Sequence, residues 1–268
     1  METQSPQSAK HGSMASAREI RVEPISAKDA SKIVSSLHYS GRAVQNSQLH
    51  LGVFLNGKCG GAMQFGPSID KRKMLGIVRG TKWNEFIELN RMAFSDWLPR
   101  NSESRAIGYA MRWMRKKYPH LKWVVSFADA TQCGDGTIYR ASGFILTQIK
   151  RNKTMLRMPD GSVVADKTLN NNPVQNVSWW RARGAKPLDG FQLRYVFFLH
   201  PEEKRNLCCA PINFSEIDRI GAGMYKGTKR VESAASGTTD LQSVRGGANP
   251  TSTLSSLIEL DGGADATR

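Results

Sequence analysis

Two side chains that can accept or donate a proton lie in segments whose patterns predict a strand and a short helix. Asp129 ends the apolar run WVVSFAD, and ligand sites of open α/β sheets gather at such strand ends. Its carboxylate could orient an amine, accept a proton or bind a metal, and it could equally be a turn or N-cap aspartate. Tyr139 follows in GTIYRASGF, the pattern of a short helix that stops at a glycine. Its phenol could donate a proton to a departing anion or simply pack on the sheet.

Two further pairs carry groups of the same kind. His38 and Tyr39 end an amphipathic segment. An imidazole can titrate or bind metal and a phenol ring can stack on a base, while a histidine at a helix end also favours the helix dipole. Glu88 and Arg91 are three apart in the strand-like run FIELNRMAF, so they face opposite sides unless a β-bulge intervenes. Glu88 is a candidate base or ion-pair partner, and Arg91 a candidate contact for a donor or phosphate.

The segments that must position these residues predict one mixed α/β domain, because helical and strand-like periodicities alternate along the chain. In chain order we expect a helix over 26–38, a hairpin over 49–65 turning at Asn56-Gly57, a strand over 86–94, a helix capped by Ser102 or Ser104 and ending near 117, a strand over 123–127, the short helix of GTIYRASGF and a strand over 144–149.

The two ends of the chain differ in composition from the middle. Residues 1–17 and 229–268 are polar and rich in small residues, which predicts a disordered N-terminal segment, with Met14 as an alternative start, and a flexible tail. We expect one domain over 18–228, of which 151–228 is an appended region rich in Trp, Arg and Asn.

The charge is strongly basic and unevenly distributed. Lys and Arg number 38 against 23 Asp and Glu, a net charge of +15, and the excess of acids within 231–268 leaves +18 on residues 1–230. Such an excess favours a polyanionic partner, with nucleic acid ahead of an anionic membrane, over a merely solvated basic surface.

Four cysteines, Cys59, Cys133, Cys208 and Cys209, show no metal-site spacing and are too few for a disulfide scaffold. No apolar run approaches the roughly 18 residues of a membrane helix. We therefore expect a soluble intracellular protein.

The segment from Glu88 to Phe144 resembles the core of the GNAT acyltransferase superfamily. The likeness rests on the strand ELNRMAF, the loop and helix after it, the buried strand and the ending IYRASGF. It implies a GNAT-like mixed central sheet flanked by helices and acetyl-CoA as donor. It also implies Tyr139 facing the acyl thioester, with Arg91, Ser104, Gly108 and Tyr139 as donor-binding residues.

One departure from that superfamily concerns the donor phosphates. The segment RNSESR replaces the usual glycine-rich loop, with no glycine before Gly108. A helix N-terminus with Ser and Arg can still hold phosphate, although Glu103 would oppose it.

More narrowly, residues 20–228 resemble the bacteriophage Mom-type DNA adenine-modification proteins, on the stretches HYSG, ELNRMA, RNSESRAIG and FADA. The resemblance implies a transferase that acts on double-stranded phage DNA in the host cytoplasm. Its product would be an N6-methylcarbamoyl-type adenine, which protects the DNA from restriction endonucleases. The catalytic residues it implies are His38, Tyr39, Glu88, Asp129 and Tyr139. An iron requirement is also implied, with His38 and Asp129 as candidate ligands.

Two other functions remain open at this point. One is an acetyl-CoA-dependent acetyltransferase acting on a protein, tRNA or a small amine. The other is a non-catalytic DNA-binding protein on a GNAT-like scaffold. The oligomeric state is also open, with a homodimer as one alternative.

Overall fold

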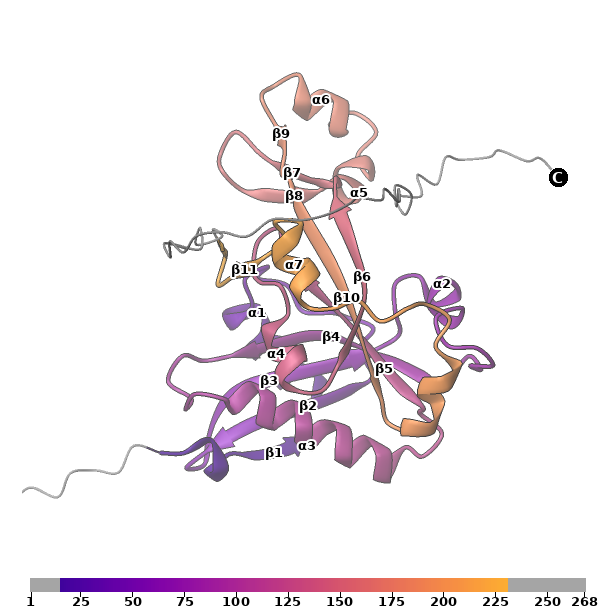
Figure 1. Ribbon diagram of the computed structural model, residues 1–268. Helices are drawn as coiled ribbons and strands as arrows, with labels where there is room; N and C mark the ends of the chain where they lie inside the picture. The colour runs from indigo at the N-terminus through magenta and orange to yellow at the C-terminus, as the bar shows by residue number, and fades with distance from the viewer. Residues whose placement is uncertain (1–14, 231–268) are drawn as a thin grey trace, which may run out of the picture. The chain divides into compact units, whose positions relative to one another are not determined.

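A seven-stranded sheet forms the centre of the computed structural model, which describes residues 15–230 (Figure 1). In their order across the sheet the strands are β1 (Arg21–Pro24), β2 (Leu49–Leu55), β3 (Lys58–Gly66), β4 (Phe86–Phe94), β5 (Trp123–Asp129), β10 (Gly190–Phe198) and β6 (Ile145–Asn152). All neighbours are antiparallel except β4 and β5, which run parallel. The expected mixed α/β fold with a central sheet is confirmed.

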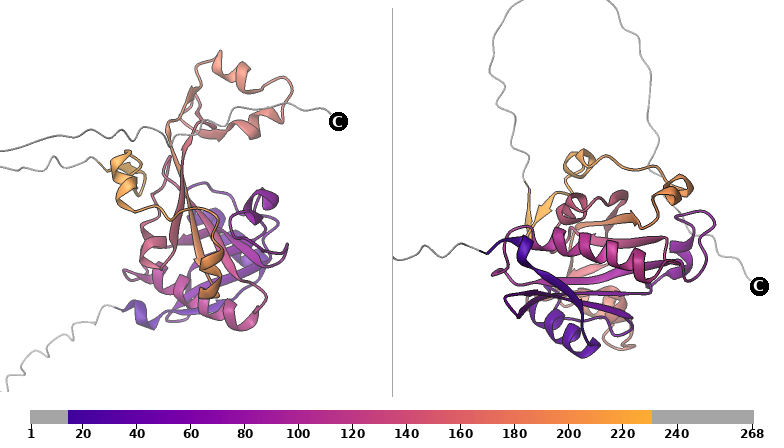
Figure 2. Two further views of the ribbon diagram at one scale, coloured as in Figure 1. Left: turned by 45° about the vertical axis from the view of Figure 1, so that its right-hand side comes forward. Right: turned by 90° about the horizontal axis from the view of Figure 1, so that it is seen from below.

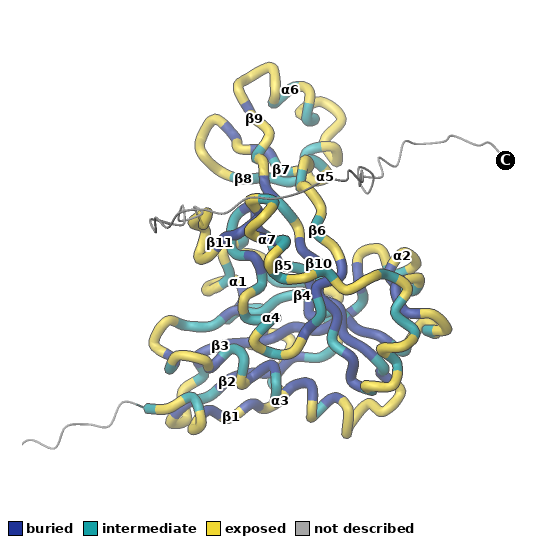
Figure 3. The backbone as a smooth tube through the Cα atoms, viewed as in Figure 1, coloured by how far each residue is buried: buried dark blue, intermediate teal, exposed yellow. Residues whose placement is uncertain are grey.

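Helices cover both faces of this sheet. Helix α3 (Ser102–Lys117) packs on the main core through Ala106, Ile107, Ala110 and Met114. Helix α1 (Ala27–Leu37) packs through Ala30 and Val34 on Ala62 and Ala93. The view from below shows α3 and α1 on opposite sides of the sheet (Figure 2). The two faces are called here the α3 side and the α1 side. The strands between them are mostly buried (Figure 3).

Several expected elements form because their signals are local. The β2–β3 hairpin turns at Asn56 and Gly57, both with positive φ, as a tight two-residue turn requires. Ser26 caps α1 by accepting a hydrogen bond from Asp29 N. The expected cap of α3 is wrong: its N-cap is Asn101, in a left-handed conformation, and Ser102 and Ser104 lie inside the first turn.

Residues 190–198 form β10, a strand that we did not expect. It lies between β5 and β6 and pairs with both. Its buried residues Leu193, Tyr195 and Val196 belong to the core of the sheet. The region over 151–228, which we expected to be an appended part of the domain, therefore supplies one of its central strands.

Between β6 and β10 the chain forms a small subdomain with its own sheet. Its elements are β7 (Met155–Arg157), β8 (Val163–Ala165), α5 (Asp166–Asn170), α6 (Val177–Arg181) and β9 (Lys186–Pro187). Elsewhere the chain has η1 (Ala17–Glu19), α2 (Lys71–Leu75), α4 (Thr137–Ala141), η2 (Pro201–Asn206), α7 (Ser215–Arg219), β11 (Met224–Tyr225) and β12 (Thr228–Lys229).

The last described residues close over the loop between β5 and α4. Asp135, buried in that loop, accepts hydrogen bonds from Met224 N and from the Arg230 guanidinium, which also pairs with Asp218. Ordered structure thus reaches Arg230, and at the other end Ser16 caps η1. The rest of the expected N-terminal segment and tail, and Met14, lie outside the described residues. Within 15–230, no helix has the length and apolar character needed to cross a membrane.

Gly136 precedes α4 and has a positive φ of 83°. A methyl group there would overlap the ring of Tyr195. We expect Gly136→Ala to lower the free energy of unfolding by roughly 2 to 4 kcal/mol, from the left-handed backbone and from overpacking. Urea denaturation measures this change.

Gly161 offers a matched control, because it has the same φ of 83° and no neighbouring atom within 4 Å of the position that a methyl group would take. Gly161→Ala should cost only about 1 kcal/mol, the backbone contribution alone. Equal losses in the two variants would show that the Tyr195 contact is unimportant.

Candidate functional site

The parallel strands β4 and β5 separate partway along their length. Four residue pairs join them, from Phe86 with Trp123 to Leu89 with Ser126. At the last pair Ser126 Oγ donates a 3.1 Å hydrogen bond to Leu89 O. Beyond this pair the two strands are no longer paired, although β4 continues to Phe94 and β5 to Asp129. We call this place the β4–β5 divergence.

A bulge in β4 lies at the start of the divergence. Gln64 of β3 pairs with Arg91 while Phe65 pairs with Leu89, so Asn90 is the extra residue. The bulge that sequence spacing required is therefore present, and it turns Glu88 and Arg91 to the same side of β4. Burial raises the pKa of Glu88, against the opposing effects of Ser68, Asn90 and the Arg91 charge.

Asp129 and Tyr39 form a hydrogen-bonded pair on the α1 side. Tyr39 OH donates to Asp129 Oδ2 at 3.0 Å, and Gln132 Nε2 donates to the same oxygen at 3.2 Å. Asp129 Oδ1 accepts from Thr131 N at 2.9 Å, so the turn role and the site role of Asp129 coexist. Burial of its hydroxyl and the Asp129 charge raise the pKa of Tyr39. The Tyr39 residue is still 48% exposed, which leaves ring surface for stacking.

His38 lies directly against Tyr39, with ring centroids 4.3 Å apart. Ser40 N donates to His38 Nδ1 at 3.1 Å, so the neutral ring carries its proton on Nε2. Burial, followed by the positive charge of Arg91, lowers the pKa of His38 to about 4, although Asp129 acts in the opposite direction. His38 is therefore neutral at physiological pH.

Tyr139 reaches the divergence from the α3 side. Its ring packs on Phe144 and Tyr195, at centroid distances of 5.3 and 5.2 Å. Burial raises the pKa of Tyr139 to about 12, while the nearby Ser126 hydroxyl acts in the opposite direction. The phenol thus remains protonated at neutral pH and is available as a proton donor.

Arg91 connects these residues electrostatically. Its charge shifts the pKa values of four of them: His38, Tyr39, Glu88 and Tyr139. Its guanidinium donates to Asn90 O at 2.7 Å and Arg42 O at 3.3 Å, and forms no ion pair within residues 15–230. Four of the five side chains expected to be catalytic therefore lie within reach of the Arg91 charge, and Asp129 joins them through its hydrogen bond with Tyr39.

Cys133 belongs to the same cluster and was missed. Burial and the Asp129 charge raise the pKa of its thiol, and the thiol in turn affects Tyr39 and Tyr139. It lies in the turn after β5, where its N–H donates to Asp129 O at 2.9 Å, but a single cysteine in a turn matches no motif that would have identified it.

The two remaining predicted residues, Ser104 and Gly108, line a separate pocket at the N-terminus of α3, with a volume of about 440 Å³. Four arginines also line it, namely Arg18, Arg100, Arg105 and Arg112. Arg100 and Arg105 belong to the segment RNSESR that we expected could hold phosphate, whereas Arg18 and Arg112 were not expected there. All four are exposed, and none forms an ion pair within the described part of the chain. We call it the arginine pocket.

The composition of the arginine pocket fits a diphosphate, because cations and a helix N-terminus both attract anions. Glu103, expected to oppose such binding, does not line the pocket. Its carboxylate instead contributes, after Asp96, to raising the pKa of Lys226. Ala141, two residues after Tyr139 in α4, also lines the pocket, so α4 connects it with the β4–β5 divergence.

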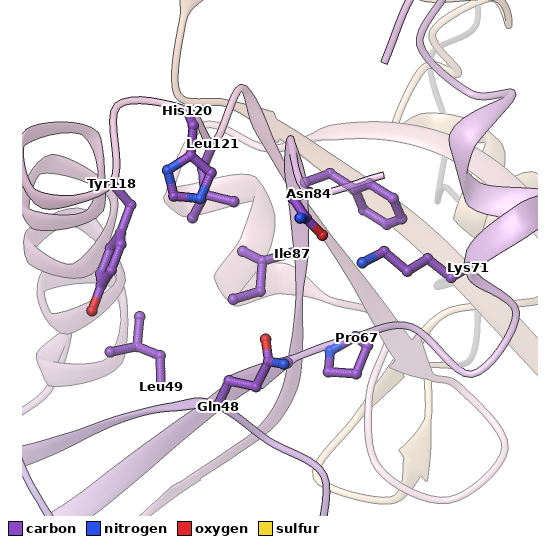
Figure 4. Close-up of a pocket in the computed structure, with 11 residues that line it drawn as sticks. Gln48, Leu49, Pro67, Lys71, Asn84, Ile87, Tyr118, His120 and Leu121 are labelled. Atoms are coloured by element: carbon purple, nitrogen blue, oxygen red, sulfur yellow. The ribbon is translucent and has the colours of Figure 1, made fainter. Parts of the chain in front are cut away.

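A second cavity, of about 360 Å³, lies at the other end of β4 (Figure 4). Ile87 lies at its centre, between Tyr118 and His120 on one side and Lys71 on the other. None of the residues expected to be functional lines it.

The described residues do not fit an iron site. Between residues 15 and 230, no three His, Cys, Asp or Glu side chains are grouped so that they could hold a metal ion. Of the two candidate ligands, His38 accepts a hydrogen bond on Nδ1 and Asp129 accepts on both oxygens. We therefore derive no step through a metal.

The lowered pKa of His38 predicts a pH dependence. The folded protein binds a proton at His38 only near pH 4, whereas the unfolded chain does so near pH 6.5. The unfolded state therefore holds more protons between these values, and stability falls as the pH is lowered through this range. We expect His38→Gln to lose less stability than the wild type between pH 7 and 4. An NMR titration midpoint near 6.5 for the His38 ring would contradict this account.

Solved acetyltransferases show a distant likeness to this chain. The ribosomal-protein-S18-alanine N-acetyltransferase of Escherichia coli is 11% identical, with a TM-score of 0.39, and the match covers 68% of this chain and 94% of that one. An IAA acetyltransferase from Bacillus cereus is also 11% identical, with a TM-score of 0.39, covering 67% of this chain and 99% of that one.

Sequence comparison gives a closer relationship. The methylcarbamoylase Mom of Escherichia phage Mu is 37% identical over 195 residues, which cover 71% of this chain and 80% of that protein. The family model of the Mom proteins matches residues 19–216, a span that contains the β4–β5 divergence and most of the arginine pocket. The chain belongs to the Mom protein family.

Proposed function

We propose that this protein is a transferase that modifies the N6 amine of adenine in double-stranded phage DNA with a methylcarbamoyl-type group. The observation that carries the proposal is the meeting of two sets of groups at the β4–β5 divergence. The Tyr39–Asp129 pair lies on the α1 side and Tyr139 on the α3 side. A relative named methylcarbamoylase supports the choice of group.

The α1 side suits the base. The N6 amine of adenine is a poor nucleophile and is paired with thymine in duplex DNA, so the base must leave the stack. The partly exposed ring of Tyr39 offers a stacking surface. Asp129 can accept a hydrogen bond from the amine and orient its lone pair, while Tyr39 and Thr131 N hold the carboxylate in position.

The α3 side suits an acyl donor of the acetyl-CoA type. When bound, such a donor supplies an activated thioester carbonyl. The arginine pocket would hold its diphosphate through Arg100, Arg105 and the N-terminus of α3. Tyr139 holds a proton at its phenol oxygen, which it can transfer to a departing thiolate.

The product places one constraint on this chemistry. A methylcarbamoyl group contains a nitrogen that an acetyl group lacks, so acetyl transfer alone would give N6-acetyladenine. Adding an amine nitrogen to an acetyl group to give a methylcarbamoyl group also removes two electrons, so a nitrogen donor and a two-electron oxidant must both take part. The mass of the modified nucleoside distinguishes the two products. We propose the host cytoplasm as the place of action, where such modification would protect phage DNA from restriction.

The proposal predicts the effect of two conservative substitutions. Asp129→Asn and Tyr139→Phe should each lower formation of the modified nucleoside at least about 100-fold, because each removes a proton-transfer or orienting group. The measurement is mass spectrometry of digested plasmid DNA from cells that express each variant.

Tyr225→Phe is the matched control, since Tyr225 is 60% exposed and lies in the β11–β12 hairpin, outside the cluster. It should modify DNA as the wild type does. Unmodified DNA from folded wild-type protein would contradict the proposed function. Wild-type yields from both site variants would contradict the assigned roles.

Donor binding is tested separately. Replacing Arg100 and Arg105 together by Gln should weaken acetyl-CoA binding at least about tenfold, because charge-assisted contacts to phosphate are lost. Isothermal titration calorimetry of the purified protein measures this affinity. Arg115 and Lys116, at the opposite end of α3, provide the control when both are changed to Gln. If the wild type does not bind acetyl-CoA, the donor assignment fails even where DNA is modified.

A further inference from the structure

The small subdomain between β6 and β10, residues 153–188, forms a separate unit at the end of these two strands (Figure 1). We call it the tip subdomain. Leu156, Met158 and Ala185 form its own core, against which Val164, Leu169, Val177 and Trp180 pack. A core of this kind, apart from the main one, holds the surface residues of the subdomain in fixed positions.

The tip subdomain starts close to the candidate site. Asp129, at the end of β5, pairs in register with Gln192 of β10. Two residues further on, Gly190 of β10 pairs with Asn152 of β6, and the tip subdomain follows directly. The tip subdomain therefore begins next to the end of β5 that carries Asp129. Strands β6 and β10 extend beyond the rest of the sheet and lead to it (Figure 2).

The tip subdomain carries a high positive charge. It has only two acids, Asp160 and Asp166, against six cations: Lys153, Arg157, Lys167, Arg181, Arg183 and Lys186. All six are exposed, and none forms an ion pair with any described residue. By contrast, Lys122 in the main body contacts two carboxylates, those of Glu85 and Glu203. Six exposed cations on so small a unit repel one another and favour a polyanionic ligand.

One of these cations is held in a defined position. The Arg183 guanidinium lies 3.6 Å from the centroid of the Trp179 ring, and its Nη1 donates to Trp179 O at 3.3 Å. Trp179 in turn packs edge-on against Trp180, which packs on the small core. This chain of contacts fixes Arg183 at the surface, where a planar guanidinium can bind a phosphate through two hydrogen bonds.

We propose that the tip subdomain binds the phosphate backbone of duplex DNA beside the base that is modified. The inference rests on the proposed function, because it takes the polyanion to be the DNA substrate. Contacts to phosphates position a protein on the duplex and carry no base sequence directly. The tip subdomain therefore supplies affinity and register, while the residues at the β4–β5 divergence act on the extruded base.

The test compares two variants with the same loss of three positive charges. The tip variant combines Arg181→Gln, Arg183→Gln and Lys186→Gln. The control combines Arg115→Gln, Lys116→Gln and Lys117→Gln at the C-terminal end of α3. The fluorescence anisotropy of a labelled duplex is measured with the full-length protein over a series of salt concentrations.

We expect the tip variant to bind at least about tenfold more weakly and to lower the slope of log Kd against log salt by about 2 to 3. The control should stay within about threefold of the wild type. Equal DNA binding by the two triple variants would overturn the inference. It would also be overturned if the tip variant no longer bound anionic phospholipid vesicles but still bound DNA as the wild type does. If circular dichroism shows that the tip variant is unfolded, a second tip variant replaces it: Lys153→Gln, Arg157→Gln and Lys167→Gln, which keeps the Trp179–Arg183 contact.

Nucleoside analysis separates this inference from the proposed function. If the wild type modifies DNA and the folded tip variant binds DNA as tightly as the wild type does, the tip inference fails and the function stands. If the wild type leaves DNA unmodified yet its binding depends on the tip cations, the function fails and the tip inference stands.

Discussion

The separation of β4 from β5 after Leu89 and Ser126 is the constraint on which the rest of the site depends. A sheet whose strands stay paired keeps the groups of its two faces apart. Here the register ends in the middle of the sheet, so Tyr139 from the α3 side and the Tyr39–Asp129 pair from the α1 side lie around one position. The bulge at Asn90 adds to this arrangement, because it turns Arg91 to the side of Glu88.

Burial is the largest cause of the pKa shifts in the site, and the charge of Arg91 acts in the same direction as burial only at His38. Burial and Arg91 together keep His38 neutral, and burial keeps Tyr139 protonated, while Asp129 accepts three hydrogen bonds. The cluster therefore combines a hydrogen-bond acceptor, Asp129, with a phenol and an imidazole that are neutral at physiological pH. In such a cluster Asp129 can accept a hydrogen bond from the amine that is modified, while Tyr139 can donate a proton to the leaving group.

Local signals made part of this architecture predictable from sequence. The turn at Asn56-Gly57, the strand over 86–94 and the glycine stop after Tyr139 depend on short-range backbone preferences, and the structure contains all three. The position of β10 between β5 and β6 depends on pairing between distant segments, which periodicity does not encode. Arg18 was missed for the same reason, since it joins its pocket only through the tertiary fold. Cys133 was missed for another reason: it lies in the turn after Asp129, and a single cysteine there matches no motif.

The central claim is that base and donor meet at the β4–β5 divergence from opposite faces of the sheet. The most direct test is a crystal structure of the protein with CoA and a duplex that carries a mismatched adenine, which leaves the stack more easily. The account predicts the extruded adenine against Tyr39 with N6 at Asp129, and the CoA sulfur beside Tyr139 on the α3 side. An adenine bound elsewhere, such as in the cavity around Ile87, or both ligands on one face, would contradict it.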